Sequence, residues 1–333
     1  MATASSALFS QVKHYLKLSR DVQLHLLQHP FEWHKFQGMF NSSVEKISLD
    51  LLQFEKNNMA RAESKIYKFK RIFEKRYRRH FLYGELPRWT FNKPFGYAGD
   101  FKIIDEIYQD TPRTIGFDGL WDTYYLQMTA CRATRQRKDD LKQFILDFAK
   151  KNRNRDIRIM NLASGPAREI KELLDNDTDK IFSKVTFDCY DLDINALNYA
   201  KELIHNSGKV NFIQKNAIRL ALKKDIKQEI STGYNMIYST GLFDYLDDRV
   251  AIRLLGNLRR LLKKDGLIII ANFGNKYCNS SAGLMEWATE WYLIYRTEAE
   301  FRKIFLNAGF FPSQLKMMHQ PDKVIQYCFA SAD

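Results

Sequence analysis

Residues 157–169 read IRIMNLASGPARE, a short apolar run that ends in a turn rich in small side chains. Short apolar runs bounded by turn residues are typical of buried strands. Similar runs recur downstream and alternate with amphipathic helical patterns, which predicts a doubly wound, mostly parallel α/β sheet. The expected strands are residues 157–162, 184–190, 210–214, 234–238 and 267–272.

The segments between these runs carry apolar side chains at three- and four-residue spacing, which predicts helices that pack on the sheet. The final apolar run, residues 324–330, is interpreted as an antiparallel last strand. The expected helices are residues 167–174, 196–207, a short one near Leu220, 248–262 and one that starts near Glu298.

The first part of the chain has a different pattern. Residues 6–80 place apolar side chains such as Ile47 and Leu51 at helical spacing and show no strand signals. The segment Ser42-Ser43-Val44-Glu45 has the capping-box pattern and predicts a helix start near Ser42. We therefore expect this region to be helical.

A connecting region separates the two patterns. Prolines and glycines interrupt residues 86–119, a helix is expected over 120–150, and the polar residues 150–156 form a hinge. The expected division is a helical basic domain at 1–85, a connecting lobe and helix that contribute to the active site at 86–155, and a sheet domain at 156–333.

Composition narrows the classes of function. No apolar run approaches the roughly 20 residues that a membrane span requires, and the N-terminus lacks the order of a secretory signal. The four cysteines are scattered without a zinc-binding spacing, so we expect reduced thiols and no metal site. These features favour a cytoplasmic protein.

The formal net charge of +13 makes an anionic partner plausible, and part of it is concentrated in residues 56–80. That block has ten Lys or Arg and only two acidic residues. Its aromatic side chains, including Phe69 and Phe73, recur at helical spacing and define one face. We interpret the cations as the outer face of a packed helix; nucleic-acid binding is the alternative.

Small and polar residues follow the first three strands. Residues 163–167 would let backbone amides approach a ligand closely, because the turn after the first strand faces the crevice of such a sheet. Asp191 follows the second strand, where a carboxylate can accept hydrogen bonds from a ribose diol. Asn216-Ala217 follows the third strand and could meet an adenine edge. Together they predict a nucleoside-binding surface, without the glycine patterns of dinucleotide folds or P-loops.

The order of these motifs resembles that of class I S-adenosylmethionine-dependent methyltransferases over about residues 156–330. The resemblance implies a Rossmann-like fold and S-adenosylmethionine as cofactor. It implies that Ala163 and Gly165 pack against the amino-acid part of the cofactor, that Asp191 holds the ribose, and that Asn216-Ala217 meets the adenine.

Further cofactor contacts follow from the same resemblance. Asn161 stands where these enzymes usually carry an acidic residue, and Ser239 ends the fourth strand. The full set of expected cofactor residues is Tyr97, Asp100, Asn161, Ala163, Gly165, Asp191, Leu192, Asn216, Ala217 and Ser239.

A narrower resemblance rests on PFGYAGD at 94–100, ATRQR at 133–137, SGPARE at 164–169 and GLFDYL at 241–246. These segments are similar to bacterial methyltransferases of the synthesis of 3-hydroxypalmitic acid methyl ester, an extracellular signalling factor. The resemblance spans both regions of the chain and implies a fatty acid as acceptor.

The acceptor site is expected beside this surface. The turn that contains Tyr97 and Asp100 suits a substrate loop, although Asp100 could equally cap a helix that starts near Phe101. Arg135 could neutralise an acceptor carboxylate; Arg137, two residues away on a helix, cannot face the same pocket.

Aromatic side chains complete the expected acceptor site. Tyr245, after the fourth strand, could orient the acceptor by hydrogen bonding. Trp287, Trp291 and Tyr295 recur at helical spacing and could line a lipid-like pocket. The expected catalytic residues are Tyr97, Arg135 and Tyr245, and the expected substrate-binding residues are Arg135, Phe243, Glu286, Trp287 and Trp291.

Three functions compete at this stage. Methylation of the carboxylate of a small or fatty 3-hydroxy acid uses the arginine and the aromatic cluster, and requires no general base because the acceptor is already anionic. Methylation of RNA or protein would use the basic block, although the Asn/Asp-Pro-Pro-Tyr/Phe signature is absent after the fourth strand. A cofactor-binding regulatory protein without transfer activity is the third possibility, since Asn161 departs from the usual acid.

Overall fold

The computed structural model describes residues 2–60, 62–205 and 208–332, with side chains from Phe9 onward. The chain divides into two compact units. The helical unit comprises Met1–Arg132 and Asn279–Tyr292, and the sheet unit comprises Ala133–Cys278 and Leu293–Asp333.

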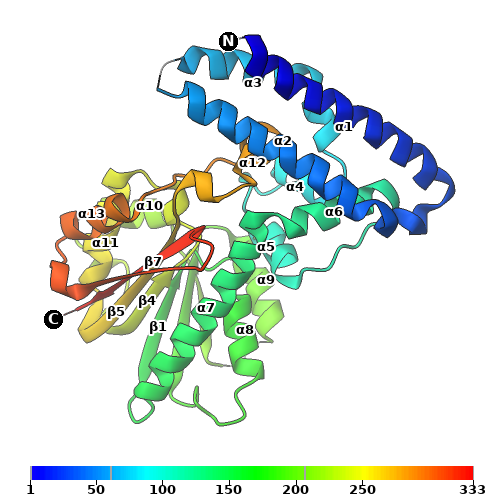
Figure 1. The fold of residues 1–333 in the computed structure, drawn as a ribbon. Helices are drawn as coiled ribbons and strands as arrows, with labels where there is room; N and C mark the ends of the chain where they lie inside the picture. The colour runs from blue at the N-terminus through cyan, green and yellow to red at the C-terminus, as the bar shows by residue number, and fades with distance from the viewer. Residues whose placement is uncertain (1, 61, 206–207, 333) are drawn as a thin grey trace. The chain divides into compact units, whose positions relative to one another are not determined.

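The sheet unit contains a seven-stranded sheet in the order β3-β2-β1-β4-β5-β7-β6 (Figure 1). The first five strands along the chain are parallel, and β7 is antiparallel to both β5 and β6. This order confirms the predicted Rossmann-like sheet and its antiparallel C-terminal run. The strands are β1 (Ile157–Leu162), β2 (Val185–Asp191), β3 (Val210–Gln214), β4 (Tyr234–Ser239), β5 (Leu262–Phe273), β6 (Leu315–His319) and β7 (Ile325–Ser331).

Helices cover both faces of the sheet because successive side chains of a strand point to opposite faces. Ile157 and Ile159 pack in one core with α7 (Thr129–Lys151), α8 (Arg168–Asp175) and α9 (Ile194–Ile204). Met160 and Leu162 pack in the other core with three further helices. Those helices are α10 (Ala217–Leu222), α11 (Asp248–Arg259) and α13 (Glu298–Asn307).

The helical unit is built around aromatic side chains. Phe40 lies 5.3 Å from Trp121 and Phe73 lies 5.2 Å from Phe81, measured between ring centroids, and all four rings are buried. The unit contains α1 (Ala2–Gln28), η1 (Pro30–Phe36), α2 (Gln37–Asn58), α3 (Glu63–Arg76), η2 (Arg78–Phe81), α4 (Glu85–Asn92), α5 (Phe101–Gln109), α6 (Gly116–Gln127) and α12 (Ala282–Trp287). The predicted helical character of residues 6–80 is confirmed.

Several predicted details are wrong. The helix expected near Ser42 begins at Gln37, and the Ser42 hydroxyl instead donates to the Gly38 carbonyl inside α2. The helix expected over 120–150 is two helices, because Met128 adopts an extended ψ of 146° between them. The helix expected over 196–207 ends at Ile204; residues 206–207 lie outside the described part of the chain.

The units do not follow the expected boundaries. Most of α7 belongs to the sheet unit, where Leu141 and Ile145 pack on the sheet. Residues Asn279–Tyr292 leave the sheet unit and join the helical unit, where Trp287 donates a 2.7 Å hydrogen bond to Glu55. No helix within the described residues is both long and apolar enough to cross a membrane.

Candidate functional site

The turn after β1 has an unusual backbone. Ala163, Gly165 and Ala167 all have φ between 48° and 55°, in the left-handed region that side chains rarely adopt. A Cβ added at Gly165 would meet no atom within 4 Å, so the space beside this backbone is open. Small side chains therefore keep the carboxyl edge of β1 accessible to a ligand.

Asp191 joins this turn to the end of β2. Its Oδ2 accepts a 2.9 Å hydrogen bond from Gly165 N, and its Oδ1 accepts a 3.0 Å bond from Asp193 N. Burial raises the pKa of this carboxyl, although these backbone bonds favour its charged form. The structure thus holds a carboxylate at the edge where the first two strands end.

The end of β3 adds an apolar surface beside this carboxylate. Asn216 caps α10, because its Oδ1 accepts a hydrogen bond from Arg219 N, and Ala217 is buried behind it. Leu192 and Ile218 follow the neighbouring strands β2 and β3 and are 59% and 49% exposed. Exposed apolar side chains at adjacent strand ends suit a flat ligand ring.

Asn161 contacts a carboxylate that the sequence interpretation left without a role. Its Nδ2 donates to Glu169 Oε1 at 2.9 Å, and Tyr238 donates its hydroxyl to the same oxygen at 2.8 Å. Glu169 is 5% exposed, and burial raises its pKa while the Arg137 charge lowers it. A buried carboxylate from the first turn of α8 therefore lies next to position 161.

The residues after β4 fall into two groups. Ser239 is fully buried and donates its hydroxyl to the Leu162 carbonyl, so it joins two strand ends. Phe243 is also fully buried, in the core between the sheet and α11. Tyr245, at the end of η4 (Phe243–Tyr245), is 41% exposed. This geometry favours Tyr245 for ligand contact and disfavours Ser239 and Phe243, whose roles stay predictions.

A buried charge network fixes this loop. Asp244 Oδ1 accepts hydrogen bonds from Phe273 N at 2.7 Å and from the Asn272 amide at 2.8 Å. Arg296, only 2% exposed, donates to the carbonyls of Phe243 and Leu246 and to Asn272. Burial raises the pKa of Asp244 to about 6, although nearby Arg137 and Arg296 lower it.

Arg137 occupies the position beside this loop. It is 4% exposed and donates a hydrogen bond to the Thr240 carbonyl, directly after β4. Arg135, on the same helix, is half-buried. As expected from their spacing, the two side chains have different surroundings. Sequence reasoning selected Arg135, and nothing in the spacing alone showed which arginine turns toward the strand ends.

The remaining expected site residues belong to the helical unit. Asp100 is fully buried and caps α5, accepting from the backbone of Lys102 and Ile103 and from the Trp89 indole. Tyr97 is 37% exposed. The helix cap is therefore confirmed for Asp100, while ligand contact by either residue stays a prediction.

The aromatic row at 287–295 is not one helical face. Helix α12 ends at Trp287, and the chain continues without regular structure through Trp291 and Tyr295. The helical spacing of Trp287, Trp291 and Tyr295 therefore does not place them on one face. Trp287 and Glu286 are buried in the helical unit. Their predicted roles as substrate-binding residues rest on sequence alone.

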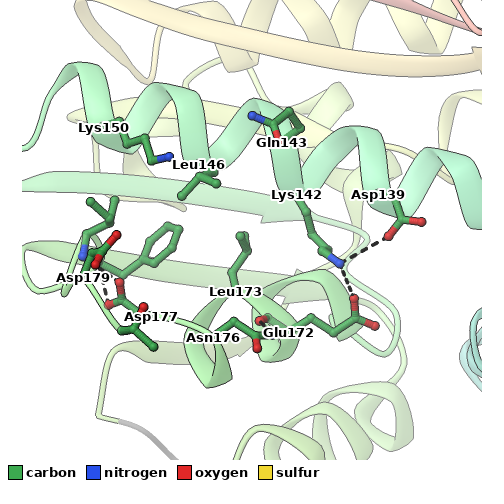
Figure 2. Close-up of a pocket in the computed structure, with 13 residues that line it drawn as sticks. Asp139, Lys142, Gln143, Leu146, Lys150, Glu172, Leu173, Asn176, Asp177 and Asp179 are labelled. Carbon is green, nitrogen blue, oxygen red and sulfur yellow. Dashed lines mark hydrogen bonds and ion pairs between the residues drawn. The ribbon is translucent and has the colours of Figure 1, made fainter.

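A surface hollow of about 520 Å³ lies between α7 and α8 (Figure 2). It is lined by the later turns of both helices and by the loop into β2, so it is remote from the carboxyl ends of the strands. Lys142 of α7 bonds across it to Glu172 of α8 at 2.6 Å and, within α7, to Asp139 at 3.3 Å. The hollow contains none of the expected site residues, and we assign it no chemistry.

The sheet unit therefore gathers the ligand-facing candidates at one edge. They are Asn161, Ala163, Gly165, Asp191, Leu192, Asn216, Ala217 and Tyr245, to which the structure adds Glu169, Arg137 and Asp244. Within the described residues, no cluster of His, Cys, Asp or Glu could hold a metal ion.

One protein family and several solved structures are similar to this chain. A family model described as "Putative methyltransferase" matches residues 96–317. No curated protein matches the chain. A protein of Bordetella parapertussis described as a possible exported protein has a TM-score of 0.56 and 18% identity, with 70% of this chain and 79% of that one covered. This likeness shows the fold alone.

Two further solved structures are more distant. A "putative O-methyltransferase" of Nostoc punctiforme has 15% identity and a TM-score of 0.44, with 58% of this chain and 56% of that chain covered. The magnesium protoporphyrin IX methyltransferase of Synechocystis, solved with bound SAH, has 10% identity and a TM-score of 0.45, with 62% and 88% covered.

Proposed function

Since the chain belongs to this methyltransferase family, whose model matches about two thirds of it, we propose that it methylates the carboxylate of a small or fatty acid. S-adenosylmethionine is the methyl donor. The observation that carries the cofactor assignment is the arrangement of Gly165, Asp191 and Asn216 at three adjacent strand ends.

The nucleoside half of the cofactor binds along β1 to β3. Asp191 accepts the ribose hydroxyls, since a carboxylate has acceptor capacity beyond the two backbone bonds it already takes. The exposed side chains of Leu192 and Ile218 would hold the adenine ring, and Asn216-Ala217 would meet its edge. The small side chains at Ala163 and Gly165 leave room for the chain that joins the ribose to sulfur.

The amino-acid half binds over the ends of β1 and β4. Glu169 accepts from the Asn161 amide, so the Asn161 side chain must present its carbonyl oxygen on the opposite side. That oxygen accepts no hydrogen bond within the described part of the chain. It is suited to accept one from the cofactor's ammonium, with the Glu169 charge behind it.

The acceptor approaches beside the loop after β4. The sulfonium methyl is already activated, so an acid acceptor in its anionic form needs chiefly to be held in line with it. Arg137 places a buried positive charge at this loop and could attract a carboxylate. We retain Arg135, Tyr97 and Tyr245 as acceptor-site candidates, and Tyr245 is the exposed phenol nearest the end of β4 along the chain.

Among acids, 3-hydroxy fatty acids are the first to test. The four segments that resemble enzymes of 3-hydroxypalmitic acid methyl ester synthesis support this choice. The resemblance covers the turn at 94–100 and the loop at 241–246. These segments contain Tyr97 and Tyr245, two of the acceptor-site candidates.

Incubation of the purified chain with methyl-labelled S-adenosylmethionine and a panel of 3-hydroxy acids tests the proposal. We expect labelled product that is released by mild base, since a methyl ester hydrolyses whereas a methyl ether or amine does not. Label that resists mild base would show that the acceptor is a hydroxyl or an amine and not a carboxylate. Label only in RNA or protein would overturn the small-acid assignment, and cofactor binding without transfer to any extract would indicate a regulatory protein.

A further inference from the structure

Helix α3 turns two aromatic side chains inward and carries three exposed cations on the opposite face. Phe69 stacks on Phe9 at 5.5 Å, and Phe73 packs edge-on against Trp287 at 5.7 Å, so both face the interior of the helical unit. Lys68, Arg71 and Lys75 are exposed and recur at three- and four-residue spacing, which places them on the opposite face. We call these three residues the α3 basic row.

The α3 basic row is unpaired in the part of the chain that the structure describes. Within the described residues, the α3 basic row forms no ion pair. The acids of the same helix are engaged elsewhere, because Glu63 accepts from Tyr67 and Glu74 pairs with Arg78 at 2.8 Å. The row therefore presents its charge to solvent undiminished by local pairing.

The charge continues past the end of the helix. Arg76 and Arg79 are also exposed, so cations extend from residue 68 to residue 79. Lys68 and Arg76, the last residue of α3, are about 12 Å apart at the helical rise. Arg61, at the other end of the basic block, lies outside the described residues.

The chemistry of this face distinguishes between anionic partners. Single-stranded nucleic acid is bound by several aromatic platforms among the cations, whereas here Phe69 and Phe73 face inward. Among the described side chains of α3, Tyr67 is the one exposed ring beside the row, 60% exposed, and its hydroxyl donates to Glu63. Tyrosine side chains favour the headgroup level of a bilayer.

We propose that the α3 basic row docks this protein on the surface of an anionic phospholipid bilayer. Lysine and arginine side chains near such a surface are attracted by its negative potential, and the effect of several is cumulative. The contact is peripheral and electrostatic. It is independent of the proposed methyl transfer, because it needs neither cofactor nor acceptor.

Co-sedimentation of the full chain with vesicles tests this proposal. One set contains phosphatidylcholine alone, and the other contains phosphatidylcholine mixed with phosphatidylglycerol. We expect binding only to the anionic vesicles and its loss at high salt. Equal binding to both sets, or no binding to either at low salt, would overturn the proposal.

A charge-reversal variant locates the contact. Lys68→Glu, Arg71→Glu and Lys75→Glu together should lower vesicle partitioning by about 100-fold, on the order of fivefold for each position. The matched control reverses three exposed lysines of the sheet unit, Lys201, Lys224 and Lys264, and changes the net charge equally.

The control variant should keep most of the binding. If both variants lose it alike, net charge and not the α3 basic row is responsible, and the proposal is wrong. Circular dichroism establishes that both variants fold. Tighter binding of RNA than of anionic vesicles, with the same dependence on the row, would assign this face to a nucleic acid instead.

Discussion

Replacing Asp191 with alanine separates its part in the fold from its part in cofactor binding. In the free protein the change leaves the Gly165 and Asp193 amides without their acceptor, at a cost of about 1–3 kcal/mol each in the free energy of unfolding. In the proposed complex it would also remove the two charge-assisted bonds that Asp191 is expected to make to the ribose. Hydrogen bonds to charged groups contribute about 1.5–3 kcal/mol each, so affinity should fall roughly 100- to 10,000-fold.

Isothermal titration with S-adenosylhomocysteine measures this loss, below the melting temperature of each variant. Asp193→Ala is the matched control, because that carboxylate caps α9 through Asn195 N and is not assigned to the ligand. We expect it to lose about 1 kcal/mol of stability and little affinity. Unchanged affinity in folded Asp191→Ala would refute the placement of the ribose at the end of β2.

Three other perturbations probe the carboxyl edge of the sheet. Glu169→Gln keeps the acceptor for Asn161 but removes the charge behind the proposed ammonium site, so cofactor affinity should fall about tenfold. A titration that shows no loss of affinity would remove Glu169 from the site. Arg296→Met removes a cation from the buried Asp244 network and should lower the free energy of unfolding by about 3–5 kcal/mol. The melting temperature should then fall by roughly 6–20 °C. The control Arg260→Met, which breaks an exposed ion pair with Asp225, should cost under about 1 kcal/mol. Because burial raises the pKa of Asp244 from 3.8 to about 6, the folded state holds this proton more tightly, and the residue's contribution to unfolding free energy falls as pH rises across that interval. Denaturation below and above this pH interval should therefore show the stability of Asp244→Asn rising relative to that of the wild type as pH rises. A stability difference that does not change with pH would contradict the assignment.

Much of the sheet unit could be predicted because its strands are apolar on both faces. The expected bounds of β1 and β3 match the structure, since each run ends at a polar or small residue that stops it. Strand β6 was missed because Leu315–His319 is a half-buried edge strand whose composition resembles a loop. The capping-box pattern at Ser42 misled because burial of Phe40, one turn before Val44, lets the helix begin earlier, at Gln37.

The candidate site could be predicted only where a residue's position along a strand decides its place. Asp191 is the last residue of β2 and Asn216 comes two residues after β3, so the topology brings them to one edge. Glu169, Asp244 and Arg296 act through side chains that meet across the fold, and no spacing in the sequence reveals such meetings. The aromatic row from Trp287 failed for a related reason, because helical spacing does not establish that the helix continues.

Hydrogen–deuterium exchange with and without S-adenosylmethionine tests the central claim most directly. If the cofactor binds across the ends of β1, β2 and β3, exchange should slow in peptides that cover residues 163–169, 191–195 and 216–220. Peptides from the hollow between α7 and α8 should be unaffected. Unchanged exchange in all three turns at saturating cofactor, or protection confined to another part of the chain, would contradict the account.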